Sequence, residues 1–204
     1  MSENLLLKKY DFQKIRDLTH LNYTKASQAS ASHLPCFGDR WGEFVERMRE
    51  KIHLRFENVN EVILFAQTKV NFTHRFGASS VQHLFDLYEC QLAQEYPQYK
   101  EAINTLSDSP YAPEGTTVIR NEKIKSNIIY YYIRILFSCM ATIPAPKIVG
   151  EIGGGLGELG RLWAINAIHQ PQNIIFIDIP ESLFFCETFI RMNFPELECY
   201  YVND

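Results

Sequence analysis

The stretch Lys147-Ile-Val-Gly-Glu-Ile-Gly-Gly-Gly-Leu-Gly157 decides the fold of this chain. Residues 147–152 are apolar and β-branched enough to predict a strand. The glycine-rich residues 153–157 follow, and residues 158–167 then have the pattern of a helix. Glycine lets the backbone turn sharply and come close to a ligand, and the start of the next helix offers N–H groups without partners inside the helix. Strand, glycine loop and helix in this order predict a ligand-binding turn of an α/β domain.

The same alternation continues toward the C-terminus. A second strand is predicted at residues 173–178, a helix with proline near its start at 180–193, and a short third strand at 199–202. Strands that alternate with helices form parallel sheets, and the expected order of the three strands is 3-2-1. Residues 144–204 are therefore predicted to be the N-terminal half of a Rossmann-like domain.

The first part of the chain, residues 1–143, is predicted to be helical. In the clearest helix, 80–96, apolar side chains recur at helical spacing and Pro97 follows. The fold class is thus α/β, with a helical N-terminal region before a partial parallel sheet. The expected helices are 5–21, 41–56, 60–76, 80–96 and 122–141, and the stretches 22–35 and 107–117 are expected to be loops.

Composition limits the partners of the chain. Hydrophobic residues make up 46% of the 204 residues and aromatic residues 13%, so a core can form. The formal charge is −4 with acidic and basic side chains well mixed, which argues against a nucleic-acid partner. Residues 128–143 are apolar but contain Arg134, and they fall short of the ~20 residues that span a bilayer. A buried helix is expected there, and no membrane span.

Cysteine and histidine residues predict no metal site. The five cysteines form no CxxC pair, which indicates free thiols in a reducing cytoplasm. The histidines are scattered over predicted helices and loops, so no general base stands out among them. They are His20, His33, His53, His74, His83 and His169. Arg120, Tyr130 and Tyr131 are candidates for covering a cofactor, with ordinary packing as the alternative for the tyrosines.

Two motifs carry the functional prediction. Gly153, Gly155 and Gly157 form a GxGxG pattern between the strand and the helix. Asp178 stands at the end of the next strand, 21 residues after Gly157. An ionised carboxylate only accepts hydrogen bonds, so it can hold both hydroxyls of an adenosine ribose at this place. The alternatives are a tight turn without a ligand for the glycines and a helix cap for Asp178.

The same glycines also fit a dinucleotide motif. Gly155, Gly157 and Gly160 form a literal GxGxxG, with an acid near the distance expected for a ribose contact. Glu151 favours a different cofactor, because an acid just before the loop suits a cationic ligand and repels a pyrophosphate. The amino group and sulfonium of S-adenosylmethionine are such a ligand. Glu151 could instead be a solvated charge at the strand end.

The segments EIGGGLGELGRLW, residues 151–163, and FIDIPESLFFCETFIRMNFPE, residues 176–196, resemble the sugar O-methyltransferase family. This family is a branch of the class I S-adenosylmethionine-dependent methyltransferases, in which a strand runs into EIGGGxGxLxR and the second strand ends in Asp-(Leu/Ile)-Pro-Glu. The match covers residues 147–204. It implies a cytoplasmic enzyme of polysaccharide biosynthesis that moves a methyl group from S-adenosylmethionine to a hydroxyl of a sugar or glycan.

The resemblance also implies roles for single residues. Asp178 would bind the ribose, and Ile179 would neighbour the adenine. Asp204, at the end of the third strand, would face the adenine amine, although a frayed terminus is the competing interpretation. The residues around the methionine part of the cofactor would be Glu151, Gly153, Gly154, Gly155 and Gly157.

In class I methyltransferases, the residues that handle the acceptor come largely from loops after the fourth and later strands. A chain that ends after the third strand is therefore expected to bind the cofactor without completing the transfer. Its first strand would be a bare edge of the sheet, which a second chain could complete. Two other functions stay open: an NAD(P)-dependent oxidoreductase or epimerase, and a non-catalytic partner module that keeps a relic cofactor loop.

Overall fold

The computed structural model describes residues 9–30, 39–58, 61–62, 65, 82–107, 109, 111, 117–120 and 123–199. Its contacts divide the chain into two units. The first unit comprises residues 1–72, 153–157 and 177–204, and the second comprises residues 73–152 and 158–176. The glycine loop therefore belongs to the first unit. The boundary expected between residues 143 and 144 stays a prediction.

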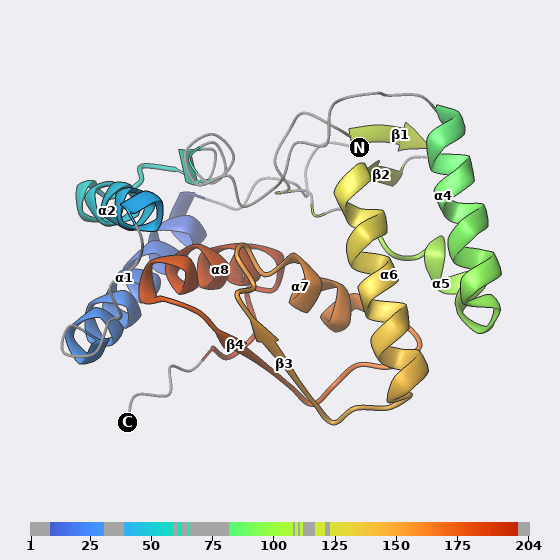
Figure 1. Ribbon diagram of the computed structural model, residues 1–204. Coiled ribbons are helices and arrows are strands. Elements are labelled where there is room, and N and C mark those ends of the chain that lie inside the picture. Colours follow the sequence, from blue (N-terminus) through green and yellow to red (C-terminus); the bar gives the residue numbers. More distant parts are fainter. Residues whose placement is uncertain are drawn as a thin grey trace. The chain divides into compact units, whose positions relative to one another are not determined.

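Three helices build the described core of the first unit. They are α1 (Lys9–Ser30), α2 (Asp39–Leu54) and α8 (Pro180–Asn193). Helix α8 packs against α1 and α2 (Figure 1). Aromatic side chains fill the space between the helices, and the rings of Phe56 and Phe184 stack with their centroids 6.2 Å apart. Burial of these rings is the main force that holds the N-terminal helices to α8.

The second unit has its own core. Its elements are α4 (Gln82–Glu95), the 3₁₀ helix η1 (Pro97–Tyr99), α5 (Lys100–Ile103), β1 (Thr117–Arg120), β2 (Lys123–Ser126), α6 (Asn127–Thr142), β3 (Ile148–Ile152), α7 (Glu158–Ile165) and most of β4 (Asn173–Ile177). Helix α6 buries Ile129, Ile133 and Phe137 at helical spacing, against Leu162 and Trp163 of α7. The expected buried helix is thus confirmed. No helix among the described residues is long and apolar enough to cross a membrane.

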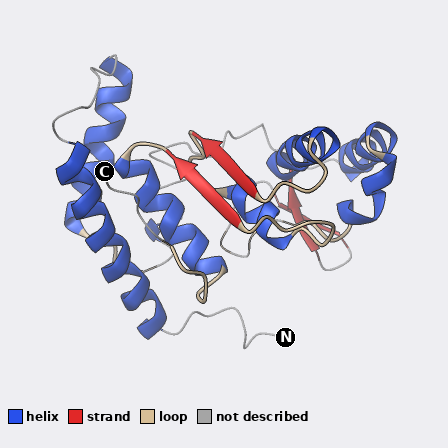
Figure 2. Cartoon of the chain, turned by 90° about the horizontal axis from the view of Figure 1, so that it is seen from below, coloured by secondary structure: helices blue, strands red, loops and turns tan. Residues whose placement is uncertain are grey.

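Strands β3 and β4 form a two-stranded parallel sheet, with α7 between them in the chain. At one end the carbonyl oxygen of Lys147 accepts a hydrogen bond from the N–H of Gln172 at 2.8 Å. At the other end the N–H of Gly153 donates to the carbonyl oxygen of Ile177 at 2.9 Å. Figure 2 shows the two strands side by side and pointing the same way. This strand–helix–strand arrangement confirms the α/β class, and the full Rossmann-like fold stays a prediction.

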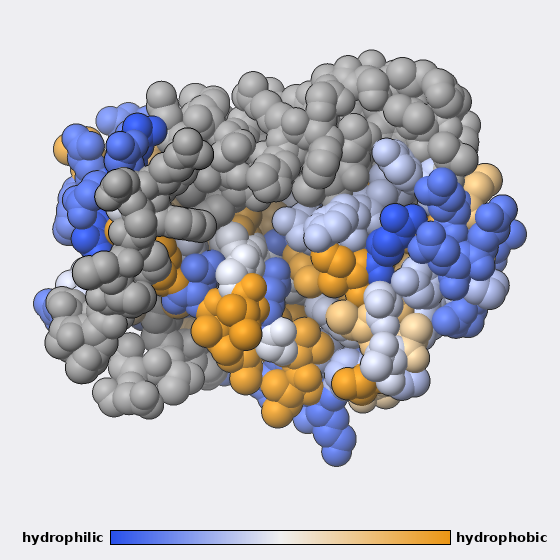
Figure 3. Space-filling view, in the orientation of Figure 1, coloured by the Kyte–Doolittle hydropathy of each residue, from blue (hydrophilic) through white to orange (hydrophobic). Residues whose placement is uncertain are grey.

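One face of this sheet is uncovered by the described residues. Along both strands exposed and half-buried side chains alternate. The exposed side chains include Ile148, Ile152 and Ile175, with 58%, 82% and 47% of their surface accessible. Figure 3 shows hydrophobic side chains gathered at the place of β3 and β4 in Figure 1. Parallel sheets are usually covered on both faces, so this apolar face is incomplete as it stands.

Two expectations for the helical region are wrong. The stretch 22–35 is not all loop, because α1 continues to Ser30; its Ala, Lys and Gln residues favour helix, and neither glycine nor proline interrupts it before Pro35. The region is also not all helical, because β1 and β2 form an antiparallel hairpin in which Arg120 pairs with Lys123. The β-branched sequence Thr-Val-Ile in β1 explains this strand.

The other helices lie close to the predicted ranges. Helices α2 and α4 confirm the predictions for 41–56 and 80–96, and α8 confirms 180–193. Helix α6 starts five residues later than the expected start at residue 122, because the hairpin takes up residues 117–126. Most of the helix expected at 60–76 and residues 200–204, with the third strand and Asp204, lie outside the described residues.

We expect the exposed isoleucines to contribute little to stability. Ile175→Thr keeps a β-branched side chain, so the free energy of unfolding in urea should change by less than about 0.5 kcal/mol, while binding of a hydrophobic dye should fall. The matched control is Leu162→Ala, which removes a fully buried side chain and should cost about 2–5 kcal/mol. A loss for Ile175→Thr as large as that of the control would show that this face is covered.

Candidate functional site

The glycine loop has a backbone conformation that only glycine adopts easily. Gly153, Gly155 and Gly157 have positive φ angles of 69°, 55° and 85°. Side chains at these positions would be strained, because a Cβ atom crowds the backbone in the left-handed region. A hydrogen bond from the N–H of Gly157 to the carbonyl oxygen of Gly154, 2.9 Å long, closes the turn just before α7 begins. The GxGxG pattern therefore has a structural cause at each of its three glycines.

Asp178 holds this loop from the end of the neighbouring strand. Its Oδ2 accepts a hydrogen bond from the N–H of Gly155 at 3.4 Å, and its Oδ1 accepts one from the N–H of Ile179 at 2.8 Å. Burial raises the pKa of Asp178 above its usual value, and these two amide donors oppose the shift. The carboxylate thus joins the glycine loop to the segment that starts α8.

Ile179 is the residue at which the chain enters α8. Its backbone is extended, with φ −67° and ψ 152°, and Pro180 follows in the first turn of the helix. Its N–H donates to Asp178, but Ile179 itself is the N-cap residue and no side-chain cap hydrogen bond forms at α8, so the alternative interpretation of Asp178 as a helix cap is wrong. A structural role and a ligand-binding role for Asp178 are compatible, because each carboxylate oxygen can accept more than one hydrogen bond.

Glu151 lies near the end of β3, within the second unit, and its side chain reaches the start of α7. Its Oε2 accepts a hydrogen bond from the N–H of Gly160 at 3.1 Å. The Gly160 amide lies in the first turn of α7 and has no partner within the helix, so Glu151 satisfies it. Glu151 is therefore not the freely solvated strand-end charge of the alternative interpretation. Its negative charge also lies where the helix dipole favours it.

Gly160 permits a close contact between α7 and β4. A Cβ atom built on Gly160 would overlap with the ring of Phe176 on β4, and it would also lie 3.3 Å from Oε2 of Glu151. A larger residue would have to displace the ring of Phe176. This is the packing role that the third glycine of a dinucleotide motif performs.

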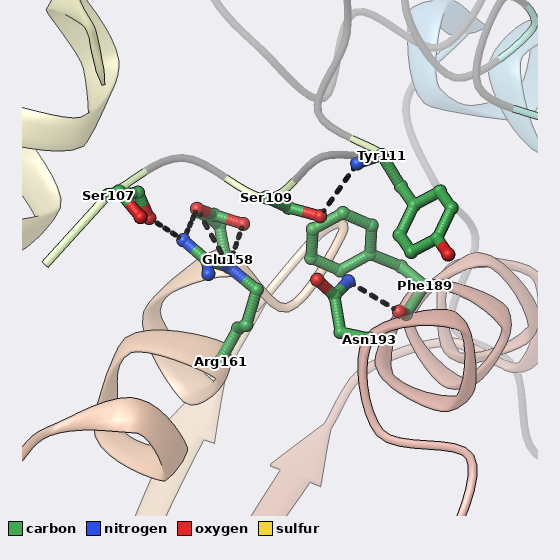
Figure 4. A network of polar contacts seen from close by, with 7 residues as sticks. All are labelled: Ser107, Ser109, Tyr111, Glu158, Arg161, Phe189 and Asn193. Atoms are coloured by element: carbon green, nitrogen blue, oxygen red, sulfur yellow. Dashed lines mark hydrogen bonds and ion pairs between the residues drawn. The ribbon is translucent and has the colours of Figure 1, made fainter. Parts of the chain in front are cut away.

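The sequence interpretation missed a buried ion pair in the first turn of α7. Arg161 donates to both carboxylate oxygens of Glu158, with its Nε 3.0 Å from Oε2, and it also donates to the carbonyl oxygen of Ser107 (Figure 4). The pair fixes the start of α7 to the segment that precedes β1. Its signal in the sequence is only an i, i+3 spacing of opposite charges, which is common on exposed helix surfaces.

Of the two tyrosines singled out on α6, Tyr130 fits the packing alternative and Tyr131 does not. Tyr130 is buried and donates to Glu89, and Tyr131 is exposed. Burial, together with the charges of Glu158 and Glu151, raises the pKa of the next residue, Tyr132, to about 12. The aromatic side chain near these acids is thus one position later than the pair singled out from sequence. The side chain of Arg120 lies outside the described residues.

The histidines form no cluster with acids in the described part of the chain. His20 packs against Phe184, and burial together with Arg55 and Arg16 lowers its pKa to about 4. The Nε2 atom of His169 lies 2.7 Å from the carbonyl oxygen of Pro146. Among the described residues no group of three or more His, Cys, Asp or Glu side chains could hold a metal ion. His33, His74 and the side chain of His83 lie outside these residues.

Comparison of the chain with protein-family models, with curated proteins and with solved structures found no match. The glycine loop and Asp178, with their geometry, are therefore the observations that bear on function.

We expect that a methyl group at Gly153 has enough space but strains the backbone. A Cβ atom at Gly153 or at Gly150 of β3 would meet no atom within 4 Å, but only Gly153 has a positive φ. Gly153→Ala should therefore lower the free energy of unfolding by about 1–2 kcal/mol, and Gly150→Ala should be neutral or slightly stabilising. Urea denaturation of both variants tests this. Equal stabilities would contradict the left-handed conformation at Gly153.

Proposed function

We propose that this chain binds S-adenosylmethionine through the glycine loop and Asp178, as part of a cytoplasmic methyltransferase whose acceptor is a hydroxyl of a sugar or glycan. One observation carries the proposal: Asp178 holds, through Gly155, a loop with three left-handed glycines. The loop follows β3 and the acid follows β4, so both lie after the carboxyl ends of paired parallel strands. Ligands of open α/β sheets bind at these ends.

The chemistry of Asp178 fits an adenosine ribose. The hydrogen bond from the N–H of Gly155 to Oδ2 is long at 3.4 Å, which leaves this oxygen able to accept a stronger bond from a ribose hydroxyl. The raised pKa reflects partial loss of water around the carboxylate. A desolvated acceptor gains more from a charge-assisted hydrogen bond than a solvated one does. Ile179 follows directly and supplies an apolar neighbour for an adenine ring.

The charges at the start of α7 favour a cationic ligand over a pyrophosphate. The N–H of Gly160, which a phosphate could use, already donates to Glu151. Glu158 adds a second carboxylate in the same turn, although Arg161 balances its charge. A pyrophosphate at this helix start would meet two acids. The amino group and sulfonium of S-adenosylmethionine carry positive charge, and the sulfonium supplies the methyl group that is transferred.

A second candidate function is that of an NAD(P)-dependent oxidoreductase or epimerase. The close contact that Gly160 permits between α7 and β4 favours it, because this glycine completes the GxGxxG pattern with Gly155 and Gly157. The uncovered apolar face with Ile148, Ile152 and Ile175 favours a third candidate, a partner module that a second chain completes.

Titration calorimetry with S-adenosylhomocysteine and with NAD tests the proposal. S-adenosylhomocysteine should bind more tightly than NAD. Asp178→Asn should weaken its binding by roughly ten- to a hundredfold, because charge-assisted hydrogen bonds contribute about 1.5–3 kcal/mol. The control Asp17→Asn makes the same change on the exposed side of α1 and should leave the affinity within about twofold.

Two outcomes would contradict the proposal. Equal affinities of wild type and Asp178→Asn would remove Asp178 from the binding site. Tighter binding of NAD would favour the second candidate. Incubation with methyl-labelled S-adenosylmethionine and a panel of nucleotide sugars and glycans then identifies the acceptor class.

A further inference from the structure

The second acid of the Asp178-Ile-Pro-Glu181 motif, Glu181, is buried against the N-terminal helices. Glu181 lies in the first turn of α8 with 1% of its side chain exposed. Its Oε1 accepts a hydrogen bond from Nε of Arg49 on α2 at 2.6 Å, across 132 residues of sequence. Tyr23 of α1 lies beside it, and burial and the charge of Glu181 raise the pKa of Tyr23 to about 12. All three residues belong to the first unit.

Favourable interaction with the helix dipole does not explain this burial. A glutamate in the first turn of a helix has the same benefit when it is exposed to water. Burying the carboxylate removes its hydration, and hydrogen bonds from Arg49 and Tyr23 replace that hydration only in part. Oε2 of Glu181 is buried and has no hydrogen-bond partner among the described residues. The carboxylate is buried although the Arg49 side chain is 33% exposed, and this cost is better explained by a need to fix where the start of α8 lies.

The start of α8 is coupled to the ligand-binding carboxylate through a stiff segment. Only Ile179 and Pro180 separate Asp178 from Glu181. Ile179 is extended and donates to Asp178, and the ring of Pro180 fixes its own φ angle. A shift of the first turn of α8 therefore moves Asp178 as well. Because the N–H of Gly155 donates to Asp178, the glycine loop should move with the carboxylate.

We propose that Arg49, through its ion pair with Glu181, is a positioning residue that sets the place of the Asp178 carboxylate and so the affinity for the cofactor. The inference rests on the proposed function for the identity of the ligand. It assigns helix α2 a role in cofactor binding, in addition to its role in the core. Ligand affinity should then depend on the charge and shape of Arg49, although its side chain need not touch the ligand.

A second ion pair on α8 offers a matched control. Arg191 donates from Nε to Oε1 of Glu187 at 2.8 Å, and 12% and 4% of these two side chains are exposed. Asn22 of α1 also donates to Glu187, at 2.8 Å. This pair is 2.8 Å long against 2.6 Å for the first, and its arginine is less exposed than Arg49, at 12% against 33%. It lies in the later turns of α8, away from Asp178 in the chain. Its loss should destabilise the helix packing without moving the start of α8.

The experiment compares Arg49→Met, Arg49→Lys and Arg191→Met by calorimetry with S-adenosylhomocysteine and by urea denaturation. Arg49→Met should weaken binding by about tenfold, and Arg49→Lys should restore much of the affinity because it keeps the charge. Arg191→Met should stay within about twofold of wild type despite a similar loss of stability. Equal losses of affinity in Arg49→Met and Arg191→Met would overturn the proposal, since they would indicate a general effect of stability.

Amide hydrogen exchange in the ligand-free protein separates this proposal from the proposed function. The N–H groups of Gly155 and Ile179 should exchange faster in Arg49→Met than in Arg191→Met, because their acceptor Asp178 has lost its fixed position. Faster exchange in Arg49→Met would support the positioning role whether or not wild type binds S-adenosylhomocysteine. A lack of binding by wild type would refute the proposed function but not the positioning role. Unchanged exchange would overturn the positioning role. If Arg49→Met does not fold, Arg49→Lys should still show a smaller increase, and its absence counts against the proposal.

Discussion

The carboxylate of Asp178 makes the hydrogen bonds that connect the parts of the first unit. It accepts hydrogen bonds from the N–H groups of Gly155 and Ile179, and so connects the glycine loop with the start of α8. The loop itself continues the parallel pairing through Gly153 and Ile177. Helix α8 in turn carries the packing of α1 and α2. One half-buried acid thus lies where the sheet end, the loop and the helical core of this unit meet.

Acids stand at the start of both helices that follow the strands. Glu151 accepts from the first turn of α7, and Asp178 accepts from the residue that precedes α8. This arrangement uses the positive end of each helix dipole for the protein's own carboxylates. In dinucleotide-binding folds the same helix start is used for a phosphate. Asp178 fits the ribose of either cofactor, so the negative charge of Glu151 at the start of α7 is the physical ground on which we propose S-adenosylmethionine rather than NAD.

Local patterns in the sequence predicted the strand, the glycine loop, α7 and the place of Asp178, because each depends on near neighbours. The hairpin at 117–126 was missed because two four-residue strands give too short a pattern next to the strong apolar helix. The partner of Glu181 could not be predicted, because Arg49 comes from a helix far away in the sequence. The i, i+3 spacing of Glu158 and Arg161 does not distinguish a buried pair from a surface pair, and only tertiary packing buries them.

Mapping the ligand on the backbone tests the central claim most directly. Amide signals of ¹⁵N-labelled protein are followed by nuclear magnetic resonance while S-adenosylhomocysteine is added. The account predicts that the signals of Gly153, Gly155, Gly157 and Ile179 shift most and saturate together, while that of Ala26 near the C-terminal end of α1 stays in place. Saturating shifts confined to other parts of the chain, or no shift in the glycine loop, would contradict it.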